Sequence, residues 1–106
     1  MIAKTPLPPY YAVIFSSIRK NGDKGYNIMA EDMLKLASKQ DGFLGVESTR
    51  EELGITVSYW RDLDSIKKWK ENSKHKSAIE KGRSIWYKSF KIRVAKVERD
   101  KKFEIA

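Results

Sequence analysis

Hydrophobic and polar residues alternate along four stretches of the chain, and a period of two residues is the pattern of β-strands. We predict strands over residues 10–20, 43–50, 53–61 and 86–99. The first of these strands has apolar side chains on both of its alternating faces: Tyr11, Val13 and Phe15 on one, and Ala12, Ile14 and Ile18 on the other. Cover is therefore expected on both faces of this strand.

Between the strands, apolar residues recur at intervals of three and four, which indicates amphipathic helices. One helix is expected over residues 26–39, with an apolar stripe formed by Tyr26, Met29, Met33 and Leu36. Asp62 stands in the capping position of a second helix, whose stripe is Leu63, Ile66 and Trp69. Asn72 and Ser73 are expected to interrupt that helix. Ser73 is then predicted to cap a further short helix that Gly82 closes.

The resulting order of elements is β-α-β-β-α-β, which predicts an α+β fold of the ferredoxin-like type. In this fold a four-stranded antiparallel sheet has both helical segments on one face. We expect one such domain over residues 10–99. The proline-rich residues 1–9 are predicted to form an extended lead-in, and residues 100–106 a charged C-terminal tail.

The second face of the predicted sheet is also apolar, although no helix is available to cover it. A bare apolar face of this size exceeds what monomers usually expose. A second copy packed against it about a two-fold axis would bury it. We therefore expect a homodimer formed by sheet-to-sheet packing.

The composition limits the chemistry and the setting of the protein. The 106 residues include no cysteine and one histidine, so disulfides and thiolate metal sites are excluded and no metal site is expected. No apolar run approaches the ~20 residues that span a bilayer, and the first nine residues lack the apolar core of a signal peptide. We expect a cytoplasmic protein without a membrane partner.

The net charge of +8 is concentrated in the second part of the chain. Residues 1–64 hold 8 Lys and Arg against 9 Asp and Glu, whereas residues 65–106 hold 14 against 5. A basic half can attract nucleic acid or an anionic ligand. The lysines are scattered over helix and strand faces, and no aromatic run typical of RNA-binding sheets occurs. A solvated surface is the favoured interpretation, and nucleic acid is not expected as a partner.

The stretch from Tyr59 to His75 gathers the residues that could take part in chemistry. Trp69 and His75 are the candidate catalytic residues, with His75 as acid, base or ligand at the mouth of a pocket covered by Trp69. The alternative interpretation makes Trp69 a core anchor and His75 a surface residue between two lysines. An unbroken helix would place the two on opposite faces, but a break at residues 72–73 would free their geometry.

A second group of residues could line a cavity between sheet and helices that binds a small aromatic or hydrophobic ligand. Its members are large aromatic residues at element ends and hydroxyls in an apolar strand, namely Trp60, Trp86, Tyr87, Ser16 and Ser17. The aromatic residues could equally fill the edges of the core, and the serines could be ordinary strand residues. Which serine faces the helices stays open at this point.

Several catalytic signatures are missing from the sequence. There is no glycine-rich phosphate loop, no recognisable arrangement of nucleophile, histidine and carboxylate, and no set of metal ligands. Catalysis would therefore depend on a bound cofactor, or on a substrate reactive enough to need only positioning and desolvation.

Several motifs follow one another along the chain: the strand start Gln40–Ser48, the strand end Ile55–Asp62, the helix residue Trp69, then His75, Gly82-Arg83 and Trp86-Tyr87. In these motifs the chain resembles the antibiotic biosynthesis monooxygenase family. This resemblance extends from about Tyr11 to Arg99. The resemblance implies a dimeric α+β barrel, in which two ferredoxin-like units pack their sheets together, with a cavity between the sheet and the helices of each subunit.

The resemblance implies an activity as well. Some members of the family are cofactor-independent monooxygenases that oxidise aromatic phenols or quinols with molecular oxygen, and others degrade haem. Of the pattern of the haem-degrading branch only Trp69 is present, because Ile79 stands where the histidine belongs and Ser16 or Ser17 where the asparagine belongs. We therefore expect a monooxygenase without cofactor acting on a small aromatic, quinol-like compound. The alternative is a non-catalytic dimeric protein of the same fold that binds a small molecule or is stress-related.

Overall fold

The computed structural model describes residues 1–105 and confirms the ferredoxin-like α+β fold. Ala106, the last residue of the expected tail, lies outside the described residues. The elements in chain order are β1 (Tyr10–Arg19), α1 (Tyr26–Ser38), β2 (Phe43–Arg50), β3 (Leu53–Trp60), α2 (Leu63–Glu71), α3 (Ser73–Lys81), the π-helical turn η1 (Gly82–Trp86) and β4 (Tyr87–Val97).

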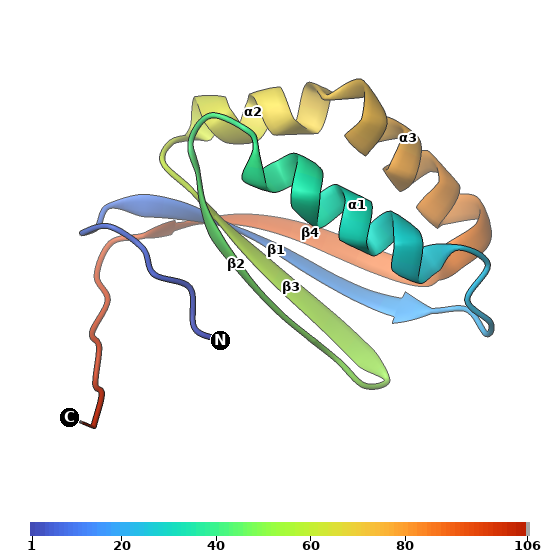
Figure 1. Cartoon of the computed structure of the whole chain (residues 1–106), viewed down its shortest axis with the longest axis horizontal. Helices are drawn as coiled ribbons and strands as arrows, with labels where there is room; N and C mark the ends of the chain where they lie inside the picture. The colour runs from blue at the N-terminus through green and yellow to red at the C-terminus, as the bar shows by residue number, and fades with distance from the viewer. Residues whose placement is uncertain (106) are drawn as a thin grey trace.

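The four strands form one antiparallel sheet in the order β2-β3-β1-β4 (Figure 1). Helices α1, α2 and α3 lie over one face, and both ends of the chain lie on the side of the other (Figure 1). Val13 of β1 is opposite Ser58 of β3 and Val94 of β4, so these residues share a face. Because Val13 packs against the core under the helices, this register identifies the helix-facing side of the sheet.

The core joins this side of the sheet to the helices. Its buried members are Ala37, Trp60 and Trp69, and the partly buried residues packed around them are Val13, Met33, Leu36, Phe43 and Ile66. Trp60 is fully buried. The helical stripes predicted from the sequence thus supply the core, and Trp60 and Trp69 form the wall between sheet and helix.

The predicted cap at the start of α2 is confirmed. The Asp62 carboxylate accepts hydrogen bonds from the backbone N–H and the hydroxyl of Ser65, at 2.8 and 2.7 Å. Gly42 has a φ of 85°, in the left-handed region that favours glycine. It also lies against Ser65, since a Cβ at this position would be 2.6 Å from the Ser65 Cβ. The loop into β2 and the start of α2 are therefore packed together.

Of the two predicted boundaries of α3, the cap at its start is wrong and its end is right. The cap is Asn72 and not Ser73, because the Asn72 side-chain oxygen accepts from the backbone N–H groups of Lys74 and His75, both at 3.1 Å. The predicted end is confirmed, because α3 ends at Lys81 and Gly82 is its C-cap. Gly82 itself has a helical φ of −56°, so the chain continues directly into the π-helical turn η1. Glycine is required at position 82 because a Cβ would be 2.9 Å from the Tyr87 ring.

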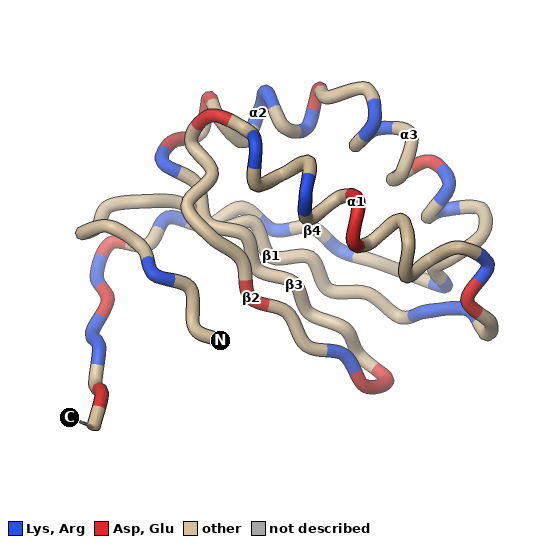
Figure 2. Tube along the Cα trace, in the orientation of Figure 1, with Lys and Arg blue, Asp and Glu red and all other residues tan. Residues whose placement is uncertain are grey.

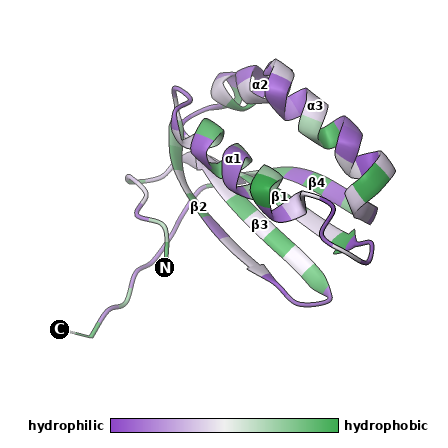
Figure 3. Cartoon of the chain, turned by 45° about the vertical axis from the view of Figure 1, so that its right-hand side comes forward, coloured by the Kyte–Doolittle hydropathy of each residue, from purple (hydrophilic) through white to green (hydrophobic). Residues whose placement is uncertain are grey.

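The face of the sheet without helices is largely hydrophobic, as expected. Ile14, Ile18, Ile55 and Val57 point to it and are partly buried. Figure 3 shows hydrophobic residues recurring along β3.

Figure 2 shows that basic residues follow β4, α2 and α3, whereas acidic residues lie at the β2–β3 hairpin. A charged edge strand of this kind discourages pairing with strands of other molecules.

Candidate functional site

The helix-facing side of the sheet forms an apolar floor beneath the helices. Paired positions of the central and edge strands supply it: Val13, Phe15 and Ser17 of β1, Thr56, Ser58 and Trp60 of β3, and Phe90, Ile92 and Val94 of β4. Ile92 and Val94 are 46% and 52% exposed, although they point to the side of the helices. The floor is therefore uncovered along β4, where a ligand could contact it.

Three aromatic rings are stacked at one end of this floor, which we call the indole end. Trp60 and Trp69 have ring centroids 6.0 Å apart with planes inclined by 27°. The His75 ring lies on Trp69, with centroids 4.1 Å apart and planes inclined by 14°. Asn72 makes this stack possible, because its extended backbone breaks the helix between Trp69 and His75. The sequence-based candidates Trp60, Trp69 and His75 are thus brought together.

The protonation state of His75 follows from its surroundings. Burial lowers the pKa of His75, and its hydrogen bond to the Trp69 carbonyl only partly offsets this. The neutral ring is therefore favoured near neutral pH. Nδ1 lies 3.0 Å from the Trp69 carbonyl oxygen, which can only accept, so the proton belongs on Nδ1. Nε2 is then left with its lone pair, which suits a proton acceptor.

The opposite end of the floor, which we call the arginine end, is built around Ser17. This serine is 2% exposed, and its hydroxyl and carbonyl both accept hydrogen bonds from the Arg50 guanidinium. Arg50 lies on β2 and reaches β1 across Gly54 of β3, where a Cβ would overlap the guanidinium. Glycine at position 54 therefore makes room for this contact.

Aromatic rings and a second arginine complete the arginine end. The Arg19 guanidinium lies 3.5 Å from the centre of the Tyr26 ring, and Arg50 lies 5.8 Å from it. Tyr26 contacts Trp86 and Tyr87 edge to face. Burial first, and the neighbouring Tyr26 hydroxyl next, raise the pKa of Tyr87 above its usual range. The Tyr87 phenol therefore stays protonated at neutral pH.

The structure thus separates the residues proposed from the sequence into three places. Trp60, Trp69 and His75 form the indole end, whereas Ser17, Trp86 and Tyr87 belong to the arginine end. Ser17 is opposite Gly54 and Tyr11 is opposite Trp60, so the two ends are six residues apart along the strands, or on the order of 20 Å. Ser16 points to the other face of the sheet. Of the two serines, Ser17 therefore faces the helices.

Sequence reasoning missed Arg19, Tyr26 and Arg50 as members of a site. Tyr26 was assigned to the helical stripe, and the two arginines fall at strand ends where charged residues are common. One signal was present: a glycine within a strand often marks the close approach of another group. Gly54 is such a glycine, but the sequence does not say which side chain occupies the space.

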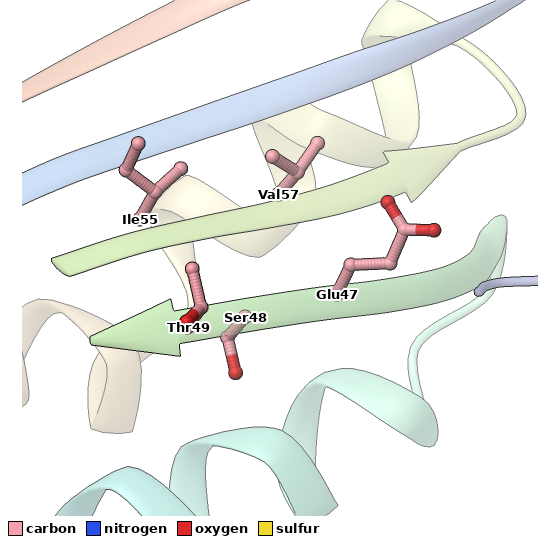
Figure 4. A pocket seen from close by; sticks show the side chains of 5 residues that line it. All are labelled: Glu47, Ser48, Thr49, Ile55 and Val57. Atoms are coloured by element: carbon pink, nitrogen blue, oxygen red, sulfur yellow. The ribbon is translucent and has the colours of Figure 1, made fainter. Parts of the chain in front are cut away.

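Two shallow hollows lie on the face without helices. One, of about 230 Å³, is lined by Glu47, Ser48, Thr49, Ile55 and Val57 (Figure 4). The other, of about 240 Å³, includes Ser16, Ile18, Leu53, Ser89, Lys91 and Arg93. Glu47 is fixed beside the first hollow, because its carboxylate accepts from the Tyr59 hydroxyl at 2.7 Å and from the Ala3 N–H at 2.9 Å. Burial and Glu47 raise the pKa of Tyr59 to about 12.

Two further searches concern residues 1–105. None of the helices there combines the length and the apolar character needed to cross a membrane. In the same range, no three His, Asp or Glu side chains are grouped in a way that could hold a metal ion.

Comparison with known proteins adds family and fold to these observations. Residues 20–95 match the family Monooxygenase af470-like. The chain is 55% identical over 105 residues to the uncharacterized protein YqjZ of Bacillus subtilis (strain 168), a match that covers 97% of this chain and 92% of that protein.

Solved structures of low sequence identity share the fold. A variant of SnoaB, a cofactor-independent oxygenase from Streptomyces nogalater, has a TM-score of 0.75 and 9% identity, with 86% of this chain and 95% of that chain covered. A conserved protein from Methanosarcina mazei Go1 has a TM-score of 0.73 and 13% identity, with 82% and 91% covered. The chain therefore belongs to the Monooxygenase af470-like family and has the ferredoxin-like α+β fold of the antibiotic biosynthesis monooxygenases.

Proposed function

We propose that this protein is a monooxygenase that oxidises a small aromatic, quinol-like compound with molecular oxygen and needs no cofactor. The observation that carries the proposal is the stack of Trp60, Trp69 and His75 beside an apolar floor, with a neutral His75 ring. Two comparisons support it: the chain belongs to a monooxygenase family, and its fold is similar to that of a cofactor-independent oxygenase.

In the proposed reaction His75 is the general base. Its Nε2 takes the proton of a phenolic hydroxyl, because Nδ1 is engaged by the Trp69 carbonyl. The phenolate then gives two electrons to O2, and a new C–O bond forms a peroxide anion on the ring. His75 returns its proton to this anion, which gives a hydroperoxide. The C–H bond at the same carbon and the O–O bond then break, so that water leaves and the ring becomes a quinone. One phenol and one O2 thus give one quinone and one water, without a separate reductant.

The aromatic surroundings contribute in a different way. The buried rings of Trp60 and Trp69 form a mostly apolar wall at the indole end of the floor, which limits the water around the reacting ring and makes the phenolate less solvated and more reactive. The exposed side chains of Ile92 and Val94 on β4 supply apolar contact to the ring of the substrate. In this proposal the protein contributes positioning, desolvation and one proton acceptor.

Oxygen uptake with a series of hydroquinones tests the proposal. We expect His75→Gln to lower kcat by about 10²- to 10⁴-fold, the usual contribution of general acid–base catalysis. Lys76→Gln is the matched control, because this neighbouring side chain is exposed and should leave kcat unchanged. Uptake by the native protein no greater than that of a Trp69→Ala/His75→Ala double variant would refute the proposal. A small molecule retained in native mass spectrometry without uptake would instead favour the non-catalytic binding protein.

We also propose that the protein is a homodimer joined through the sheet faces that lack helices. Partly buried apolar residues such as Ile14, Ile55 and Val57 support this assembly, and a second copy would cover both hollows of that face. Sedimentation should give a species of twice 12.3 kDa. Val57→Lys should shift it to the monomer, whereas Lys70→Ser on the helix side should not. A single 12.3 kDa species for the native protein would contradict the proposal.

A further inference from the structure

We propose that Arg50 and Arg19, at the arginine end of the floor, bind the carboxylate of an aromatic acid. This inference rests on the proposed function for the aromatic nature of the ligand, and deepens it by naming the substrate class as anionic. It does not depend on the oxygen chemistry, because it concerns binding alone.

Arg50 is held in one position before any ligand arrives. Two of its N–H groups donate to the hydroxyl and the carbonyl of Ser17. Below it, Gly54 offers a flat surface without a side chain. A guanidinium fixed in this way loses little conformational freedom when it binds an anion, which favours tight binding.

Arg19 adds a second fixed positive charge. Its Nε donates to the Trp86 carbonyl at 3.2 Å and its Nη2 to the Gly22 carbonyl at 2.9 Å. Its guanidinium also lies on the Tyr26 ring. The two arginines therefore flank the same tyrosine, and each retains N–H groups that these bonds do not use.

Neither guanidinium has an ion-pair partner among residues 1–105, although both side chains are partly buried. Two exposed arginines do have one: Arg61 pairs with Asp41 at 3.0 Å, and Arg83 with Glu80 at 3.6 Å. Arg93 and Arg99 are exposed, so water compensates their charges. Two partly buried positive charges without a carboxylate are costly unless an anion compensates them. A bound ligand would supply that anion.

The surroundings indicate which kind of anion fits. A planar guanidinium matches a carboxylate with two parallel hydrogen bonds. The rings next to it are aromatic: Phe15 contacts Tyr87 at 5.4 Å and Phe90 at 5.4 Å between centroids. A ligand with its carboxylate on the arginines would thus lay its rings on the floor and point toward the indole end. An aromatic acid meets both requirements.

Isothermal titration calorimetry with 2-naphthoate and its neutral analogue 2-naphthamide tests the inference. We expect the native protein to bind 2-naphthoate at least about 10-fold more tightly. Arg50→Gln should lower the affinity for 2-naphthoate by about 10- to 100-fold, as for loss of a charged hydrogen bond, and leave 2-naphthamide unaffected. Arg99→Gln removes the same charge at an exposed position and should keep the preference.

A second variant protects the test against misfolding. Arg50→Gln could unfold the protein by leaving Ser17 without its donors, whereas Arg19→Gln leaves that contact intact and should also reduce the preference. Equal affinities for both probes, no binding of 2-naphthoate, or a preference that persists in Arg19→Gln and folded Arg50→Gln would overturn the inference. Binding with this preference but without oxygen uptake would count only against the monooxygenase.

Discussion

Replacement of Gly54 by alanine should have opposite effects in two backgrounds. In the native protein the new methyl group would overlap the Arg50 guanidinium and displace it from Ser17. The buried Ser17 hydroxyl would lose its donor, which costs about 1–3 kcal/mol. Glycine in a strand is itself less favourable than alanine by about 0.5–1 kcal/mol. The middle of these two ranges gives a net loss in the free energy of unfolding of about 1 kcal/mol.

In an Arg50→Ala background there is no guanidinium to displace. Gly54 lies in a regular strand and is not among the glycines of positive φ, so its backbone accepts alanine. Gly54→Ala should then raise the free energy of unfolding by about 0.5–1 kcal/mol. The change of sign reports the contact between residues 50 and 54 and nothing else in the chain.

Urea denaturation of the four proteins of this cycle, followed by tryptophan fluorescence, measures the effect. The midpoints should fall for Gly54→Ala in the native background and rise for the same change in Arg50→Ala, with equal slopes. The same shift in both backgrounds would refute the account, because Arg50 would then not occupy the space above Gly54. A rise of the midpoint on Gly54→Ala in both backgrounds would refute the account as well.

Three further predictions concern stability. Gly42→Ala should lower the free energy of unfolding by clearly more than the ~1 kcal/mol expected for Gly22→Ala, as measured by chemical denaturation. Both glycines have φ above 80°, but only at Gly42 would the new methyl group overlap Ser65. Asn72→Ala should lower the free energy of unfolding by about 1 kcal/mol, whereas Ser73→Ala should change it little, because Asn72 is the cap of α3; equal losses would contradict this. The pKa of His75 is lower in the folded protein than in the unfolded chain, where it is about 6.5. As the pH drops through about 6.5, the unfolded chain therefore takes up a proton first, and the free energy of unfolding should fall until the pH is below the folded pKa. Urea midpoints from pH 8 to 5 should show that fall reduced in His75→Gln, and an unchanged pH profile would count against the buried neutral ring.

The order and type of the elements could be predicted because each depends on a local pattern. Alternation along residues 10–20 identifies a strand. Two helical stripes, with Met33 and Leu36 on one and Ile66 and Trp69 on the other, specify the helix faces that form the core. The cap of α3 could not be predicted in this way. Asn72 and Ser73 are both good caps, and only the backbone geometry decides between them.

The candidate site was predictable only in part. Trp60 and Trp69 could be placed between sheet and helix from their positions at a strand end and on a helical stripe. The stack of His75 on Trp69 could not, because six residues of a continuous helix place two side chains about 120° apart around the axis and about 9 Å apart along it. It arises from the break at Asn72, whose direction depends on the packing of α3 against its neighbours.

The sequence by itself determined the ferredoxin-like fold, an apolar sheet on both faces, and the few residues able to move a proton. Periodicity is a property of neighbours in the chain, so it can be read without coordinates. The tertiary structure decided that Ser17 and not Ser16 faces the helices, and that Arg50 crosses Gly54 to reach it. These contacts join residues 33 positions apart through strand register, and register is set by the packing of the whole sheet.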